Sequence, residues 1–414
     1  MPGEPILIVG AGIVGLTLGQ ALKKKGIPFE IYERDPTPDA RGQGWAITLH
    51  WALEYLRQIV PDETLARIQA VQVDPDVARH DNGTFLFINL ATGEPRFKIP
   101  PSARWRVSRE GMRRALLAGI EDHVHWGKRV VGVDTSSTPP DRVRLVFDSE
   151  NENSDSDGEG RVTGKMVIGV EGSRSIVRRV LRPDAYSNEQ LPIRFTGVAV
   201  DLTPAEVQPL RSMDPLLFQG CEPESGTFFW FSMLETPLGN GTAGTGAERF
   251  RAQVCMSWPV RSEGDEVAST DEGRLANMKR RADRFTPFLR KVVQDIPQGT
   301  PVTEITLADW ECLDWDNRDG RVTLAGDAAH AMTMYRGEAA NHGLLDAFNL
   351  VQAIGRIYSG QATAKQALDE YEVEMRKRTR RAVRLSRQAC HDAHTWERLN
   401  KESAILTKRS IEGE

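Results

Sequence analysis

The beginning of the chain alternates between short apolar runs and a segment with helical periodicity. Residues Ile6–Val9 form a β-branched run typical of a strand buried on both faces. Residues 14–22 carry apolar side chains at helical spacing, and Gly26 follows three lysines, as at a helix C-terminus. A second strand-like run, Phe29–Tyr32, ends at the acidic Glu33. The pattern therefore predicts strand, turn, helix and strand in succession.

The turn between the first strand and the helix reads GAGIVG, with glycines at positions 10, 12 and 15. In a dinucleotide-binding turn, Gly10 permits the tight turn, Gly12 lets the main chain approach a pyrophosphate, and Gly15 allows close helix–strand packing. The helix N-terminus offers free N–H groups to phosphates. Glu33 is placed to accept hydrogen bonds from a ribose, and an acid there argues against the 2′-phosphate of NADP in this site.

Later segments repeat this pattern and twice change to an antiparallel one. Strand-like runs at residues 166–170 and 321–325 each lead into a polar turn. Residues 77–97 predict antiparallel hairpins, and residues 193–260 predict antiparallel strands again, with apolar and polar side chains alternating over residues 250–258. Helices are expected at residues 51–59, 111–120, 271–295 and 363–394. A second GxGxxG match, residues 239–244, lies between two strand-like runs with no helix after it and predicts a hairpin loop.

Composition narrows the class of protein. The chain has 414 residues, enough for more than one domain, and its net charge of −5 gives no general attraction to nucleic acid or anionic membranes. Four scattered cysteines show neither metal-ligand spacing nor a disulfide framework, as in a reducing compartment. His391 and His394 share a helix face but lack a third metal ligand. With no signal-peptide pattern and no membrane-spanning apolar run, we expect a cytoplasmic protein without a metal site, nucleic-acid partner or membrane span.

Three motifs follow one another along the chain in a specific order. They are the glycine turn of residues 10–15 with Glu33, the sequence VEGSRS at residues 170–175, and GDAAH at residues 326–330 followed by RGE at 336–338 and Asp346. Together they resemble the class A, single-component FAD-dependent aromatic monooxygenases typified by para-hydroxybenzoate hydroxylase. The resemblance covers essentially the whole chain, and residues 331–343 are most similar to members from fungal natural-product pathways.

The resemblance implies an α/β fold in which two domains are interleaved. A Rossmann-like FAD-binding domain would take residues 1–75, 101–188 and 305–360. An antiparallel β-sheet domain for substrate would take residues 76–100 and 189–304, and a long helical segment residues 361–414.

The resemblance also implies a set of cofactor-binding residues. They are Gly10, Gly12, Gly15, Glu33, Arg34, Arg41, Gly44, Arg109, Asp327, Gly337 and Ala340. Of these, Arg41 and Gly44 would lie along the flavin, and Arg109 and Asp327 along the ribityl and pyrophosphate portion. The helix starting at residues 337–340 would direct its N–H groups at flavin N1 and O2 and stabilise the anionic reduced flavin. Two departures from the family pattern are Glu171, where aspartate is usual, and Met334, where proline is common.

The activity that the resemblance implies is oxygenation of a small molecule. NADPH or NADH, bound transiently, would reduce FAD, and O2 would add at flavin C4a to give a hydroperoxide. One oxygen atom would then pass to an aromatic or other electron-rich substrate by hydroxylation or epoxidation, in secondary metabolism. Tyr335 and Arg336 are the expected catalytic residues, with turn stabilisation as the alternative role, which we favour for the neighbouring His330. Baeyer–Villiger oxidation, oxidative cyclisation or another redox reaction on this fold is the alternative activity. A weaker alternative is a non-enzymatic interaction module in which bound FAD only stabilises the fold.

Overall fold

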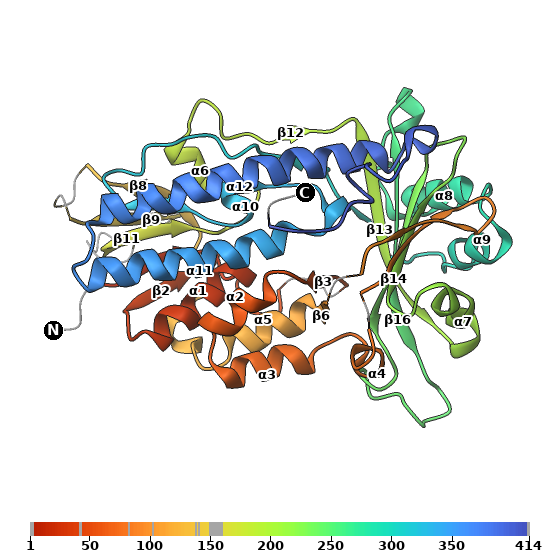
Figure 1. Ribbon diagram of the computed structural model, residues 1–414, viewed down its shortest axis with the longest axis horizontal. Helices are drawn as coiled ribbons and strands as arrows, with labels where there is room; N and C mark the ends of the chain where they lie inside the picture. Colours follow the sequence, from red (N-terminus) through yellow and green to blue (C-terminus); the bar gives the residue numbers. More distant parts are fainter. Residues whose placement is uncertain are drawn as a thin grey trace.

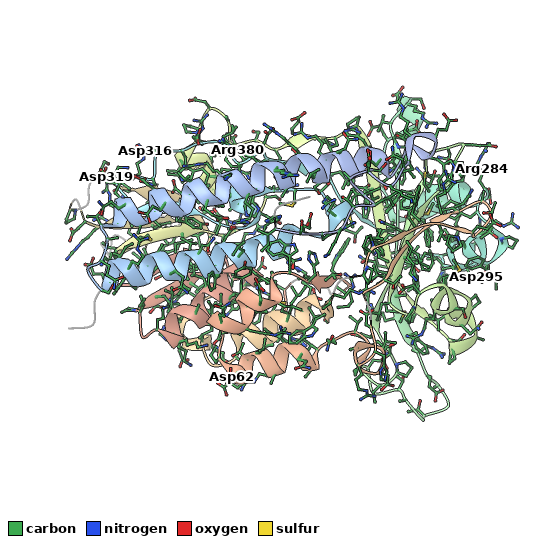
Figure 2. The ribbon with its side chains drawn as sticks, viewed as in Figure 1. Asp62, Arg284, Asp295, Asp316, Asp319 and Arg380 are labelled. Carbon is green, nitrogen blue, oxygen red and sulfur yellow. The ribbon has the colours of Figure 1, made fainter. Side chains whose placement is uncertain are left out.

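The computed structural model describes residues 4–40, 44–81, 83–101, 103–136, 139, 141–148 and 160–411. Two bodies lie side by side in Figure 1, a parallel sheet flanked by helices and a second sheet with its own helices. Charged side chains such as Asp62, Arg284 and Asp316 are exposed at the periphery (Figure 2). Arg41, expected at the cofactor, lies outside the described residues.

The first sheet has five parallel strands in the order β19-β11-β1-β2-β7. The strands are β1 (Ile6–Val9), β2 (Phe29–Tyr32), β7 (Val124–His125), β11 (Met166–Gly169) and β19 (Val322–Leu324). Strands β1, β11 and β19 are buried throughout, as expected for a sheet covered on both faces. Because all the pairs are parallel, the C-terminal ends of segments far apart in the chain share one edge.

Helices and smaller sheets surround this parallel sheet. The helices are α1 (Ile13–Lys24), α2 (Leu53–Ile59), α3 (Asp62–Ala70), α5 (Arg109–Leu117), α6 (Ile176–Leu181), α10 (Asp327–His330), α11 (Ala339–Tyr358) and α12 (Ala364–Asp392). The smaller sheets are β3 (Ala46–Leu49) with β6 (Trp105–Ser108), β12 (Glu189–Gln190) with β18 (Ala308–Asp309), and β8 (Val130–Asp134), β9 (Val143–Phe147) and β10 (Arg161–Gly164). The expected α/β class, with its long C-terminal helix, is confirmed.

The second sheet has seven strands in the order β17-β13-β16-β15-β14-β4-β5. They are β4 (Phe85–Asn89), β5 (Pro95–Ile99), β13 (Ile193–Leu202), β14 (Leu217–Cys221), β15 (Phe228–Glu235), β16 (Phe250–Pro259) and β17 (Thr303–Glu304). All neighbours are antiparallel except β14 and β4. Side chains of α7 (Pro204–Met213), α8 (Asp271–Ala282) and α9 (Pro287–Gln294) pack with Phe229 and Phe231 of β15, whereas Phe228 packs with Tyr335 in another cluster.

Two local expectations were wrong in detail. Residues 77–97 do not form hairpins throughout, because α4 (Pro75–Ala78) precedes the single hairpin β4–β5. The Asp74 carboxylate accepts hydrogen bonds from the first N–H groups of α4, and Pro75 occupies its first turn. The expected helix 271–295 is split into α8 and α9, because Pro287 starts a new helix. Residues 239–244 do lie in the loop between β15 and β16, as predicted.

One buried carboxylate joins three elements beside the parallel sheet. Asp346 of α11 is fully buried, and its Oδ2 accepts hydrogen bonds from Gly326 N at 2.8 Å and His330 Nε2 at 2.6 Å. Its Oδ1 accepts from the Arg378 guanidinium of α12 at 2.7 Å. Burial alone would raise the pKa of Asp346, but the charges of His330 and Arg378 hold it well below its usual value. The turn after β19 is thereby tied to both long helices.

Replacing Arg378 with methionine should lower the free energy of unfolding by about 3–5 kcal/mol, because a buried Asp346 charge would lose its guanidinium partner. Urea denaturation at saturating FAD measures the change. Arg381→Met, at an exposed position on the same helix, serves as control and should shift stability by about 0.5 kcal/mol or less. Equal stability of the two variants would contradict the role assigned to Asp346.

Candidate cofactor and substrate site

A cleft of about 950 Å³ runs along the C-terminal edge of the parallel sheet. Ligand pockets hold about 300–1,000 Å³, so this one has the size that an extended ligand needs. Seven of the expected cofactor-binding residues line it: Gly10, Gly12, Glu33, Arg34, Arg109, Asp327 and Ala340. They come from the ends of β1, β2 and β19 and from the starts of α5 and α11. Gly15, Gly44 and Gly337 do not line this cleft.

The turn after β1 has the geometry of a phosphate cradle. Gly10 adopts φ of 111°, a region that favours glycine. A Cβ at Gly15 would lie 2.1 Å from the Gly10 carbonyl oxygen, whereas a Cβ at Gly12 would meet nothing within 4 Å. Gly15 therefore permits packing of α1 on the turn, and Gly12 leaves the main chain open to the cleft. Glu33 is 3% exposed and accepts a hydrogen bond from Ala11 N at 2.8 Å. This bond ties the turn after β1 to the end of β2.

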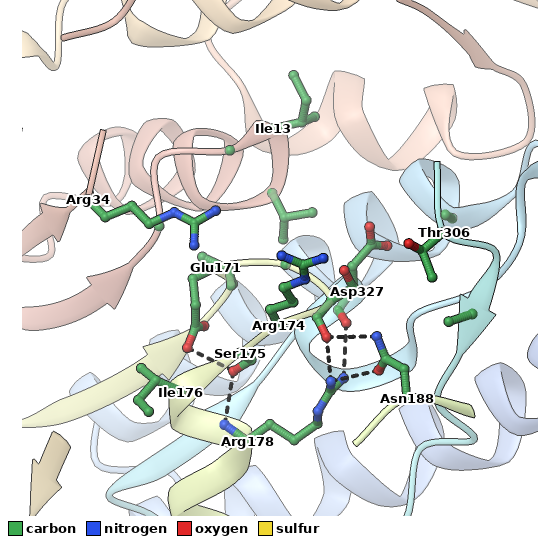
Figure 3. Close-up of a pocket in the computed structure, with 18 of the residues that line it drawn as sticks. Ile13, Arg34, Glu171, Arg174, Ser175, Ile176, Arg178, Asn188, Thr306 and Asp327 are labelled. Carbon is green, nitrogen blue, oxygen red and sulfur yellow. Dashed lines mark hydrogen bonds between the residues drawn. The ribbon is translucent and has the colours of Figure 1, made fainter. Parts of the chain in front are cut away.

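Charged side chains around the cleft suit a polyanionic ligand that also carries hydroxyl groups. Arg34, after β2, and Arg174, after β11, extend toward it, and Asp327 lies beside Arg174 (Figure 3). Surrounding protein raises the pKa of the Asp327 carboxyl, while His330, Arg109 and Arg178 act to lower it. Its side chain is nevertheless exposed to the cleft, where a carboxylate accepts hydrogen bonds from ribityl or ribose hydroxyls.

Arg178 organises one wall of the cleft and was not identified from the sequence. This buried guanidinium donates to Ser173 O, to Asn188 Oδ1 at 2.7 Å and to Ala328 O at 3.3 Å (Figure 3). It also stacks 4.8 Å from the centre of the Trp310 ring. Burial lowers the pKa of Arg178 to about 10, so it stays charged at neutral pH. Two of its partners, Ala328 and Trp310, lie in segments that only the folded chain brings to Arg178, and no local sequence signal marks those contacts.

Glu171 stands where the family pattern has aspartate, and its carboxylate accepts hydrogen bonds at the start of α6. Its Oε1 accepts hydrogen bonds from Ser175 Oγ at 2.8 Å and from Val177 N at 2.9 Å, at the start of α6. Its Oε2 is buried without a partner among the described residues, and burial raises the pKa of the carboxyl. The longer side chain thus reaches the first turn of α6 while it lines the cleft.

A second, smaller cavity lies between the parallel-sheet domain and the seven-stranded sheet. It is lined by Thr48, His50, Gly83, Phe85, Ile99, Pro100, Arg104, Leu217, Trp230, Tyr335, Arg336, Gly337 and Arg409. Successive residues of β3 face the two spaces, Ile47 the cleft and Thr48 the cavity. Likewise Ala339 and Ala340 line the cleft, and Gly337 lines the cavity. Strand β3 and residues 337–340 therefore form a wall shared by the two spaces.

The two expected catalytic residues lie at this second cavity, but their polar atoms already have partners. The Tyr335 hydroxyl donates to Ser257 Oγ at 2.8 Å, and burial raises its pKa well above the usual value. Ser257 in turn lies 2.9 Å from His394 Nε2. Arg336 is buried, forms an ion pair with Glu338 at 2.6 Å and donates to Thr407 Oγ1 at 2.8 Å. Their expected roles in proton handling stay predictions.

Comparisons with known proteins agree with this geometry. Residues 4–386 match the family model described as an FAD binding domain. The chain is 43% identical over 355 residues to the FAD-dependent monooxygenase dbaB of Emericella nidulans, covering 85% of this chain and 87% of that protein. It is 34% identical over 373 residues to the FAD-dependent monooxygenase tazP of Aspergillus terreus, covering 84% and 88%.

A solved structure shows the same fold at low sequence identity. Klebsiella pneumoniae HpxO, complexed with FAD and uric acid, superposes with a TM-score of 0.71 at 20% identity and covers 95% of this chain and 90% of its own. Among the described residues, no helix has the length and apolar character needed to cross a bilayer.

Removal of the Asp327 carboxylate tests the cofactor cleft. Asp327→Ala should bind FAD at least about tenfold more weakly, since a hydrogen bond to a charged group contributes about 1.5–3 kcal/mol. Flavin absorbance of the purified protein and titration of the flavin-free protein with FAD measure the effect. Asp184→Ala, at an exposed acid outside the cleft, should retain FAD. Normal FAD affinity in Asp327→Ala would contradict the proposed contact.

Proposed function

The chain belongs to the family of FAD-dependent class A monooxygenases, and on that premise we propose that it oxygenates an aromatic or other electron-rich small molecule. NADPH or NADH would serve as the transient electron donor and O2 as the oxidant. We propose hydroxylation or epoxidation in the secondary metabolism of the producing organism. Bound FAD, once reduced, supplies the activation of O2 for transfer of one oxygen atom.

One observation carries this proposal. The large cleft and the smaller, largely apolar cavity share a wall built from β3 and residues 337–340. A cofactor held along the cleft would present its reactive ring at this shared wall, next to a substrate in the cavity. Phe85 and Trp230 line the cavity with aromatic surface, which suits a flat aromatic substrate.

The residues of this chain would hold the cofactor, orient the substrate and exclude water. Main-chain N–H groups after β1 and the N-terminus of α1 would bind the pyrophosphate, with Arg34 and Arg109 contributing charge. The N-terminus of α11 would direct its partial positive charge at the flavin ring. The seven-stranded sheet covers the cavity and would keep water from the reacting atoms.

Arg336 and Tyr335 remain our candidates beside the substrate, and their contacts favour positioning over proton transfer. The Arg336 guanidinium is committed to Glu338 and to acceptors in the C-terminal segment. The Tyr335 hydroxyl is part of a buried hydrogen-bond network that runs from Tyr335 to Ser257 and from Ser257 to His394. Burial lowers the pKa of His394 to about 4, so this imidazole is neutral at physiological pH.

The decisive experiment follows the fate of oxygen. FAD-loaded protein is mixed with NADPH or NADH, a panel of phenols and aromatic acids, and isotopically labelled O2. We expect substrate-stimulated oxidation of the nicotinamide and one labelled oxygen atom in the product, detected by mass spectrometry. Stimulated oxidation that yields an unlabelled, rearranged or cyclised product would instead support the alternative redox chemistries. A labelled lactone or ester would identify Baeyer–Villiger insertion.

A further inference from the structure

The second cavity is surrounded by more arginine side chains than there are carboxylates paired with them. Arg104 is paired with Asp81, its Nε lying 2.8 Å from Asp81 Oδ2. Arg336 is paired with Glu338 at 2.6 Å. His50 adds no charge, because burial and the nearby Arg409 lower its pKa to about 3. Two further guanidinium groups lie at this cavity, that of Arg106 behind its wall and that of Arg409 within it.

Arg106 is buried behind the cavity wall without a carboxylate partner among the described residues. It is 6% exposed and donates only to the hydroxyls of Thr48 at 2.8 Å and Ser232 at 2.6 Å. Its Nε has no partner. Its guanidinium lies 5.9 Å from the centre of the Trp230 ring, which lines the cavity. Its charge therefore acts across a wall of low polarity, where screening by water is weak.

Arg409 comes from the last described segment of the chain and lines the cavity directly. After α12 the chain turns back toward the middle of the molecule (Figure 1), and Ala404, Ile405 and Leu406 pack in a cluster with Tyr335. The guanidinium of Arg409 donates to main-chain carbonyls only, at 3.1 Å to Arg336 O and 3.3 Å to Tyr335 O among them. Within the described chain it makes no ion pair, and Glu338, whose charge acts on it, pairs through Oε2 with Arg336. Burial and the charge of Arg336 lower the pKa of Arg409 to about 9, so the guanidinium stays charged at neutral pH.

The space left beside Arg409 is small. The cavity holds about 70 Å³, whereas a cavity of about 150 Å³ is known to bind benzene. An aromatic substrate therefore needs lining side chains to move, and Arg409 is one that only main-chain carbonyls hold in place. An anionic oxygen on the substrate would replace those neutral hydrogen bonds with stronger, charge-assisted ones. A neutral substrate offers no such replacement and would leave the cation poorly paired.

We propose that the second cavity selects aromatic substrates that carry an anionic oxygen, a carboxylate or a phenolate, and that Arg409 is the residue that binds it. The proposal rests on the proposed function in taking this cavity as the substrate site. The charge of Arg106 supports the same preference, but Arg409 is the guanidinium lining the cavity that forms no ion pair in the described chain.

Binding to the FAD-loaded protein tests this preference without turnover. Benzoate and benzamide have the same shape and differ in charge, and calorimetric titration gives the affinity of each. We expect benzoate to bind at least about tenfold more tightly, as one charge-assisted contact predicts. A third arm with para-cyanophenol, titrated below and above the pH at which it ionises, shows whether a phenolate is taken as well as a carboxylate.

Variants of the C-terminal segment assign the preference to one side chain. Arg409→Gln should remove the preference for benzoate and leave FAD content unchanged, because Arg409 does not line the cofactor cleft. Arg409→Lys should retain part of it. Lys401→Gln removes a positive charge from an exposed position of the same segment and should behave as wild type.

Three outcomes would overturn the proposal: no benzoate binding, equal affinity for benzoate and benzamide, or a preference that survives in Arg409→Gln. Labelled oxygen in the product of a neutral substrate, together with any of these, would leave the monooxygenase function standing. Conversely, a benzoate preference that depends on Arg409, in a protein that transfers no oxygen, would refute the proposed function and retain the anion site.

Discussion

The buried carboxylate of Asp346 is the interaction on which the arrangement of the site depends. It accepts hydrogen bonds from the turn after β19, from His330 and from Arg378, and so fixes that turn against α11 and α12. The turn carries Asp327 into the cleft, and α11 carries Ala339 and Ala340 to the shared wall. A shift of this one contact would therefore move both the cleft and the wall that the cleft shares with the proposed substrate cavity.

The shared wall explains how one chain keeps two chemically different spaces in contact. Its cofactor side is built from turns at strand ends, where N–H groups and charged side chains converge. Its other side meets aromatic residues of the seven-stranded sheet. Because neighbouring residues of β3 point to opposite sides, the strand needs only two residues, Ile47 and Thr48, to contribute to both.

The parts of this structure that could be predicted from sequence are those whose requirements are local. The turn of residues 10–15 needs glycines at set positions and an acid after the next strand, and all of these are adjacent in sequence or periodic. Arg178 and Arg409 escaped detection because contacts that hold them, such as Arg178 with Ala328 and Arg409 with Arg336, join residues far apart along the chain. The split between α8 and α9 was missed although Pro287 marked it, because the apolar spacing continues across the break.

The two sides of the site also differ in how they tolerate mutation. The proposed phosphate-binding turn after β1 offers main-chain groups, which most substitutions leave in place, whereas the proposed substrate cavity is lined by side chains that a point mutation can replace. One of those side chains, Arg409, belongs to a segment outside both sheets. If the proposed site holds, point mutations that reshape the cavity would change which substrate is accepted while FAD binding persists.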